Sequence, residues 1–105
     1  MKPKKFNLNK ISKELRKAWI PKNVEAINNV VLRIAKFDGG YHWHKHDKDE
    51  LFIVFKGKIK IKTENGNIIL KQNDGVKIPK GVMHCPVSIK PSIVLMFEPL
   101  KLNSQ

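Results

Sequence analysis

Short apolar runs, separated by turn residues, constrain the fold of this chain more than any other feature of its sequence. Val, Ile and Phe are frequent in these runs, and Gly, Pro, Asn and Asp lie between them. Many short strands with such turns favour an antiparallel sandwich or barrel. The sequence therefore predicts an all-β fold. We expect strands at residues 30–37, 41–46, 50–55, 59–61, 68–70, 76–78, 83–87 and 93–98.

Turn sequences indicate how these strands connect. Asp-Gly-Gly at 38–40 and Asn-Asp-Gly at 73–75 are typical turns. Asn-Gly at 65–66 follows an alternating run and predicts a two-residue hairpin. The run at 51–55 is apolar on both faces, so one face is expected to line the interior. The other face then needs a cover, either the N-terminal helix or a second subunit.

The N-terminal region differs because its apolar residues recur at helical spacing. Between residues 9 and 19 they fall on one face of a short amphipathic helix. We expect Asn9 or Ser12 to cap this helix and Pro21 to end it. We interpret the helix as a cover over an edge or face of the main body.

The length of 105 residues allows one domain with a modest core. We divide it into an N-terminal helical segment, residues 1–22, packed on a barrel of residues 23–105. Cys85 is the only cysteine, which excludes an intrachain disulfide and suits a reducing compartment. The basic N-terminus lacks the apolar core of a signal peptide, and no apolar run is long enough to span a membrane. We therefore predict a cytoplasmic protein with no membrane partner.

A formal net charge of +12 favours anionic ligands or surfaces. However, only Arg16 and Arg33 among the 21 basic residues are arginines, and the lysines are spread along the whole chain. Arginine is preferred for base readout and for bidentate phosphate contacts. We therefore favour a solvated lysine surface and predict no nucleic-acid partner.

The densest chemical feature is the sequence YHWHKHDKDE at residues 41–50. Side chains alternate between the faces of a strand, so His42, His44 and His46 would share one face. Three imidazoles in an apolar interior are costly unless their nitrogens have partners. Because neutral imidazole is a common ligand of divalent metals, we interpret His44 and His46 as metal ligands.

Two further residues complete the expected ligand set. Glu50 follows a polar turn and begins an apolar strand, so a hairpin returns its carboxylate to the histidines. Asp47 and Asp49 are expected to face water. His84 follows the Pro-Lys-Gly turn at 79–81, which directs it inward. Three nitrogens and one oxygen would then surround one metal ion. The predicted ligands are His44, His46, Glu50 and His84.

Nearby residues have less specific interpretations. His42 is either a pocket residue behind the ligands or a structural residue, and both interpretations stay open. Cys85 is expected to be a packed thiol that points away from His84, because adjacent strand residues face opposite sides. We expect the neighbouring aromatic residues in the core rather than on a ligand platform: Trp43, Phe52 and Phe55.

Two motifs in the middle of the chain resemble those of the cupin family. The first runs through Gly39-Gly40, His44-Lys45-His46, Glu50 and Gly57, and the second through Asn73-Asp74, Pro79-Lys80-Gly81 and His84. Together they span residues 38–87. The departures from the family pattern affect turns and the rim rather than the ligands. The first leading glycine is displaced by one or two positions, Asn73 replaces the second, and Ser88 stands where an asparagine often follows.

The resemblance implies a double-stranded β-helix, which is a jelly-roll barrel and usually dimeric. It also implies one divalent transition metal, Mn, Fe, Ni or Zn, with one or two coordination positions open for water or substrate. The sequence at 43–52 and the Phe-Glu-Pro at 97–99 are similar to the small cupins called mannose-6-phosphate isomerase-like. That label does not demonstrate isomerase activity.

Two functions of different classes follow from these observations. The first is a metal-dependent enzyme that acts on a small oxygenated metabolite by oxygenation, isomerisation or decarboxylation. The alternative is a non-catalytic module that binds or senses a metal and a small ligand, because no clear acid–base pair stands beside the ligands. Both predict a small-molecule ligand, and the basic residues favour an anionic one. We also predict a homodimer.

Overall fold

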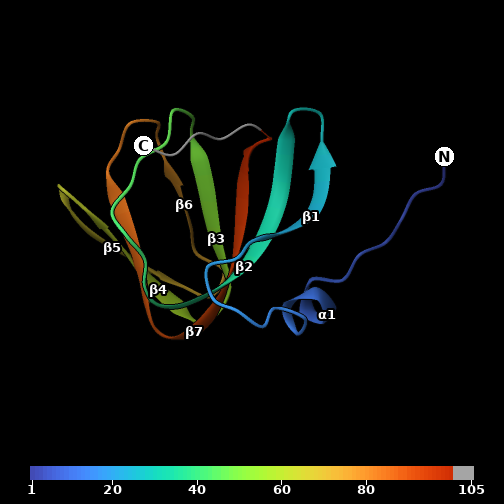
Figure 1. Cartoon of the computed structure of the whole chain (residues 1–105), viewed down its shortest axis with the longest axis horizontal. Coiled ribbons are helices and arrows are strands. Elements are labelled where there is room, and N and C mark those ends of the chain that lie inside the picture. The colour runs from blue at the N-terminus through green and yellow to red at the C-terminus, as the bar shows by residue number, and fades with distance from the viewer. Residues whose placement is uncertain (101–105) are drawn as a thin grey trace.

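The computed structural model describes residues 1–100, so residues 101–105 of the predicted barrel segment lie outside the described residues. The described residues form one short helix and seven antiparallel strands (Figure 1), which confirms the predicted all-β fold. The elements are α1 (Leu8–Ser12), β1 (Lys22–Ile27), β2 (Val30–Gly40), β3 (Glu50–Lys56), β4 (Lys58–Thr63), β5 (Gly66–Lys71), β6 (Gly75–Ile78) and β7 (His84–Pro99).

The long strand β7 organises the sheet because β2 pairs with both of its halves, while its other edge pairs first with β4 and then with β3. Its first residues, from His84 to Val87, pair with β4. The residues from Ile93 onward pair with β2 on one edge and with β3 on the other. β1, β5 and β6 extend the sheet beyond β2, β4 and β3 respectively. The sheet bends around one interior, with β4 and β5 set apart from β1 (Figure 1), as expected for a jelly-roll barrel.

Side chains that alternate along the strands fill this interior. On β3, Glu50, Phe52 and Val54 are buried, while the residues between them are half-buried. The outer face of β3, with Leu51 and Ile53, is therefore incompletely covered. Its cover by a second subunit stays a prediction. The core cluster consists of Ala35, Phe37, Phe52, Val54, Ile59, Ile61, Leu70, Ile78, Val94 and Met96.

The predicted hairpin at the Asn-Gly sequence is confirmed. Thr63 of β4 pairs with Gly66 of β5, which leaves Glu64 and Asn65 in the loop. The Thr63 hydroxyl donates a hydrogen bond to the Gly66 carbonyl at 2.6 Å. Gly66 has a φ of 121°, a conformation that glycine adopts without steric strain.

Two predicted turns or breaks are continuous strand in the structure. Residues 83–87 and 93–98, predicted as separate strands, both belong to β7. Residues 38–40, predicted as a turn, are the end of β2. The register between β2 and β7 shifts beside Gly39, whose φ is 78°. Phe37 pairs with Ser92 and Gly39 pairs with Ser88, so residues 89–91 of β7 lie opposite the single residue Asp38, and the extra residues of this irregularity are on β7.

Residues 41–46 do not form the predicted strand. They make an irregular segment in which His44 forms an isolated bridge to His84. The prediction that Trp43 lies in the core is wrong, because its side chain is 46% exposed. Phe52 is buried as predicted, and Phe55 is half-buried.

The N-terminal helix is shorter than predicted. α1 ends at Ser12 and not near Trp19. Its N-cap is Asn7, whose side-chain oxygen accepts a hydrogen bond from the Lys10 N–H at 2.8 Å. The predicted caps, Asn9 and Ser12, were therefore wrong, because the helix begins earlier than its apolar pattern indicated.

Tertiary contacts of Trp19 hold the chain that follows the helix against β2. The Trp19 backbone N–H donates to the Lys36 carbonyl at 2.8 Å, and its indole N–H donates to the Asp38 carbonyl at 2.9 Å. These bonds fasten Trp19 to β2 with a φ of 66°, which a helix does not allow. α1 also contacts β2. Among residues 1–100, no helix combines the length and apolarity needed to cross a membrane.

Candidate metal centre

Backbone hydrogen bonds join two distant stretches of chain at the histidines. The His44 N–H donates to the His84 carbonyl at 3.0 Å, and the His84 N–H donates back to the His44 carbonyl at 2.9 Å. The Gly81 N–H donates to the His46 carbonyl at 2.9 Å, and Gly81 has a φ of 81°. The turn at 79–81 therefore anchors His46 as well as leading into His84, and its positive φ favours glycine.

His44, His46 and His84 form a buried cluster that is positioned to bind a metal ion. One ring nitrogen from each residue lies within 4.8 Å of the others. Their side chains are 7%, 9% and 0% exposed, respectively. Buried imidazole nitrogens need partners, and a metal ion is a partner that serves all three at once.

Two of the rings are oriented by backbone carbonyls. His44 Nδ1 lies 2.9 Å from the His42 carbonyl oxygen, and His84 Nδ1 lies 2.8 Å from the Val82 carbonyl oxygen. A carbonyl oxygen only accepts, so both Nδ1 atoms carry the proton, and each Nε2 keeps a lone pair for a metal. Burial lowers the pKa of His44 more than the bond to His42 raises it, and the charges that His84 and His46 can carry lower it further. The neutral, ligating form of His44 is therefore favoured.

Glu50 brings a carboxylate to the same point. It is the first residue of β3 and is 5% exposed. Its Oε1 lies 3.4 Å from His46 Nε2 and 3.7 Å from His84 Nε2. Within the described part of the chain, Glu50 Oε1 and His84 Nε2 are buried without a hydrogen-bond partner. Unpaired buried polar atoms are costly, and one cation between these two would satisfy both.

Beside Glu50 lies an ion pair that was not predicted from the sequence. A guanidinium nitrogen of Arg33 lies 2.7 Å from Glu98 Oε1 and forms an ion pair with it, and the Glu98 side chain is 3% exposed. Burial and the neighbouring Glu50 raise the pKa of Glu98 to about 8, although Arg33 opposes this shift. Burial also acts to raise the pKa of Glu50, but the side chains of His84, Glu98 and His46 outweigh it, so that this pKa is lowered. Of the two neighbouring carboxyl groups, Glu98 therefore has the higher pKa in the metal-free protein.

The sequence contains a signal for this ion pair. Arg33 and Glu98 each interrupt a run that is otherwise apolar. Each also lies two residues from a buried residue of its own strand, Ala35 on β2 and Met96 on β7, so its side chain points to the same face of the sheet. A charged residue at an inward position of a strand is rarely left without a partner.

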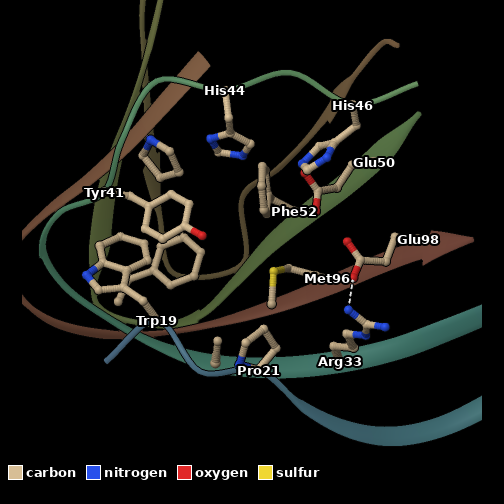
Figure 2. A pocket seen from close by; sticks show the side chains of 13 residues that line it. Trp19, Pro21, Arg33, Tyr41, His44, His46, Glu50, Phe52, Met96 and Glu98 are labelled. Atoms are coloured by element: carbon tan, nitrogen blue, oxygen red, sulfur yellow. Dashed lines mark ion pairs between the residues drawn. The ribbon is translucent and has the colours of Figure 1, made fainter. Parts of the chain in front are cut away.

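The charged residues border a cavity of about 200 Å³. Figure 2 shows His44, His46 and Glu50 along one side of it, with Glu98 and Arg33 next to Glu50. A small molecule in this cavity would therefore contact the side chains of His44, His46 and Glu50.

Aromatic side chains also line this cavity, and we call them the aromatic wall: Trp19, Phe37, Tyr41 and Phe52. Figure 2 shows Trp19 and Tyr41 side by side, away from Glu98 and Arg33. The ring centroids of Trp19 and Phe37 lie 4.4 Å apart, and those of Trp19 and Tyr41 lie 4.9 Å apart. Trp19 was predicted on the helix face, so its place in this wall is a correction. The bonds that fasten it to β2 bring it there.

The remaining residues considered from the sequence lie outside the cluster. The His42 side chain is exposed and its ring centroid lies 4.0 Å from that of Tyr41, while its carbonyl orients a ligand ring. Asp49 is exposed, as expected, and accepts a hydrogen bond from the Lys80 N–H at 2.9 Å. Cys85 is a buried thiol, as predicted, and its sulfur contacts the Tyr41 carbonyl at 3.4 Å.

Comparison with known proteins places this site in a family. The family model for the cupin domain matches residues 31–98. The chain is similar to the uncharacterized protein YdbB of Bacillus subtilis (strain 168), with 39% identity over 80 residues that cover 74% of this chain and 71% of that protein.

Solved structures share the fold. A cupin-2 domain containing protein from Shewanella frigidimarina aligns with a TM-score of 0.87 and 32% identity, covering 90% of this chain and 93% of that one. The hydroquinone 1,2-dioxygenase PnpCD, in complex with Cd²⁺ and 4-hydroxybenzonitrile, aligns with a TM-score of 0.79 over 90% of this chain and 72% of that one. Its identity is 16%, so this likeness concerns the fold alone. With the family model covering both histidine motifs, the chain belongs to the cupin domain family.

Proposed function

We propose that this cupin binds one divalent transition metal and uses it to act on a small oxygenated metabolite. The proposed ligands are His44, His46, Glu50 and His84. The observation that carries the proposal is the pair of buried, unpartnered atoms, Glu50 Oε1 and His84 Nε2, which face each other at 3.7 Å. A cation between them removes the cost that both atoms otherwise impose.

The donor set favours Mn, Fe, Ni or Zn over a softer metal. Three imidazoles and one carboxylate suit borderline divalent ions, whereas copper(I) and thiolate-seeking ions prefer sulfur. When bound, such an ion supplies Lewis acidity toward a ligand oxygen or, as Fe or Mn, a route to dioxygen chemistry. The chain's own residues would shape the cavity and orient the ligand.

Two findings support an enzyme over the non-catalytic alternative. The first is Glu98, a second buried carboxyl beside Glu50, because a carboxyl group next to a metal site is a candidate for acid–base steps. The second is the dioxygenase of the same fold whose structure contains Cd²⁺ and a small aromatic nitrile. The narrower likeness to the mannose-6-phosphate isomerase-like cupins stays a prediction.

Turnover by metal-loaded protein tests this proposal. The protein is purified without a His-tag and loaded separately with Mn, Fe, Ni and Zn. Each form is then assayed on hydroxy acids, phenols, diketones and sugar phosphates. We expect turnover with at least one metal and its loss in His84→Ala, but not in His42→Ala, which alters an exposed ring. Metal binding without turnover on any substrate would favour the binding module, and absence of metal binding would remove both functions.

Three further proposals concern the whole protein. We propose a homodimer because the outer face of β3 is incompletely covered, and sedimentation at several concentrations tests this. We propose a cytoplasmic location on the basis of the single cysteine. We propose no nucleic-acid partner because lysine provides almost all of the basic charge, and binding to DNA that persists at high salt would contradict this.

A further inference from the structure

We propose that Arg33 is the specificity-determining residue of the cavity, and that the ligand is a small planar monoanion, an aromatic carboxylate in its simplest form. Its carboxylate would accept hydrogen bonds from the Arg33 guanidinium, and its ring would lie on the aromatic wall. The inference rests on the proposed function, because the metal ion provides part of the positive charge of the cavity.

Arg33 lies where its side chain can contact a ligand in the cavity. It lies on β2 with the same parity as Ala35 and Phe37, and all three line the cavity. One guanidinium nitrogen forms an ion pair with Glu98, but among the described residues Arg33 Nε is buried without a hydrogen-bond partner. Its side chain is 27% exposed, so the guanidinium remains accessible from the cavity. Arginine presents a planar array of donors that matches a carboxylate, and this array is only partly used.

The charges around the cavity favour an anionic ligand. A divalent ion contributes two positive charges and Arg33 one, while Glu50 and an ionised Glu98 together contribute two negative charges. The cavity is then left with a net charge of about +1. An anionic ligand with one charge balances this excess, whereas a neutral ligand leaves it buried and uncompensated.

The cavity suits one aromatic ring in both its size and its lining. An apolar cavity of about 150 Å³ accommodates a benzene ring, and this cavity measures about 200 Å³. It therefore has room for one six-membered ring with small substituents. Trp19, Phe37 and Tyr41 offer ring faces and edges for stacking and few hydrogen-bonding groups. A sugar phosphate, which is larger, doubly charged and rich in hydroxyl groups, fits this lining poorly.

A pair of probes that differ only in charge tests the proposal. Calorimetric titration of metal-loaded protein with 4-hydroxybenzoate and with 4-hydroxybenzamide compares an anion with its neutral isostere. We expect the carboxylate to bind about tenfold or more tightly than the amide, as for a hydrogen bond to a charged group. In Trp43→Phe protein, Trp19 is the remaining tryptophan, so a change in its fluorescence on titration reports binding at the aromatic wall.

Variants of Arg33 locate the preference. Arg33→Gln is expected to weaken the binding of 4-hydroxybenzoate about tenfold and to leave the binding of 4-hydroxybenzamide nearly unchanged. Arg33→Lys keeps a positive charge opposite Glu98, and we expect it to retain part of the preference even if Arg33→Gln fails to fold. Lys36→Gln is the matched control, because it removes the same charge from β2 at a position of opposite parity that does not line the cavity. It is expected to bind both probes as the wild type does.

The outcomes separate this inference from the proposed function. Metal binding accompanied by equal affinity for the two probes, or by a preference that survives in both Arg33 variants, would overturn the role of Arg33 while the metal site stands. A preference that depends on Arg33 in protein that binds no metal would support the role of Arg33 and overturn the proposed function. Tight binding of a sugar phosphate in place of the carboxylate would overturn the ligand class.

Discussion

The face that β2, β3 and β7 turn toward the interior has two ends with opposite chemistry. The charged end carries one ionisable side chain from each strand: Arg33, Glu50 and Glu98. The apolar end carries one aliphatic side chain from each of the same strands: Ala35, Val54 and Val94. Val94 pairs with both of the others in the sheet register, and all three are at most 1% exposed.

The difference shows that strand alternation decides which residues face inward but not what they do there. At the apolar end, burial of methyl groups stabilises the folded state. At the charged end, burial opposes folding unless each charge has a partner, and a metal ion is the partner proposed for Glu50. Stability and ligand binding are thus assigned to opposite ends of the same strands, and substitutions at the two ends should separate them.

The largest expected effect is the loss of metal at the charged end. His84→Ala removes a ligand that is fully buried, so we expect metal affinity to fall by more than ~100-fold, beyond the effect typical of residues that only support a ligand. Glu50→Gln keeps one oxygen and is expected to weaken binding less. Elemental analysis after dialysis measures both, with His42→Ala as the control. Full metal content in His84→Ala would break the assignment.

At the apolar end, the largest effect concerns stability. Val54→Ala removes methyl groups from a site that is 0% exposed, and we expect a loss of about 2–3 kcal/mol in the free energy of unfolding. Metal content in the folded protein should stay unchanged. Ile53→Ala, on the half-buried outer face of the same strand, is the matched control and should cost less. Equal losses in denaturant titrations would show that the two faces of β3 do not differ as described.

Two glycines with positive φ sharpen the comparison: Gly57, between β3 and β4, and Gly39, on β2. A Cβ at Gly57 would lie 2.3 Å from Ser92 Oγ, and Gly57 has a φ of 97°. Gly57→Ala is therefore expected to cost about 2 kcal/mol from the clash and the backbone strain together. Gly39→Ala, with a φ of 78° and no atom within 4 Å of the added Cβ, tests the strain alone. Thermal unfolding of both variants measures the difference, and a Gly39→Ala loss as large as that of Gly57→Ala would exclude a role for the contact with Ser92.

The smallest expected effect is a pH dependence at the charged end of the metal-free protein. The pKa of Glu98 is about 8 when folded, against an ordinary value of 4.5, so the folded state binds the extra proton in between. Its contribution to stability therefore falls as the pH rises from about 4.5 to about 8. Glu98→Gln should flatten this fall by on the order of 1–2 kcal/mol, since Arg33 is partly solvated.

The difference between wild type and Glu98→Gln measures the titration of Glu98 together with its coupling to Glu50, whose pKa the Glu98 side chain helps to lower. His44 and Glu50 have lowered pKa values, and their contributions change with pH in the opposite direction, falling as the pH falls. His44 is unchanged in the two proteins, so its contribution cancels in the comparison. Unfolding by urea at several pH values, with a chelator present, gives the two curves. Parallel curves would contradict the protonation assigned to Glu98.

Much of the candidate metal centre was predictable because its residues have few other uses. Two histidines two residues apart, a glutamate at the start of an apolar strand and a histidine after a Pro-Lys-Gly turn indicate a common site without any knowledge of the fold. The hairpin at the Asn-Gly sequence was predictable for a similar local reason, since glycine alone reaches its φ without strain.

The remaining features depend on contacts between distant segments. Trp19 has helical spacing in the sequence, but hydrogen bonds to β2 carry it into the aromatic wall. Arg33 and Glu98 lie far apart in the chain, and only the pairing of β2 with β7 brings them within 2.7 Å. Local propensity contains no information about such pairings, which is why the ion pair and the cavity lining were missed.

The central claim is that three imidazoles and one carboxylate hold a single metal ion inside the barrel. Anomalous diffraction from crystals of metal-loaded protein, recorded at the absorption edge of the metal, tests it most directly. We predict one peak per chain, bonded at about 2.0–2.3 Å to a nitrogen of His44, His46 and His84 and to an oxygen of Glu50. A metal peak elsewhere on the molecule, or one whose coordination sphere omits His84, would contradict the claim.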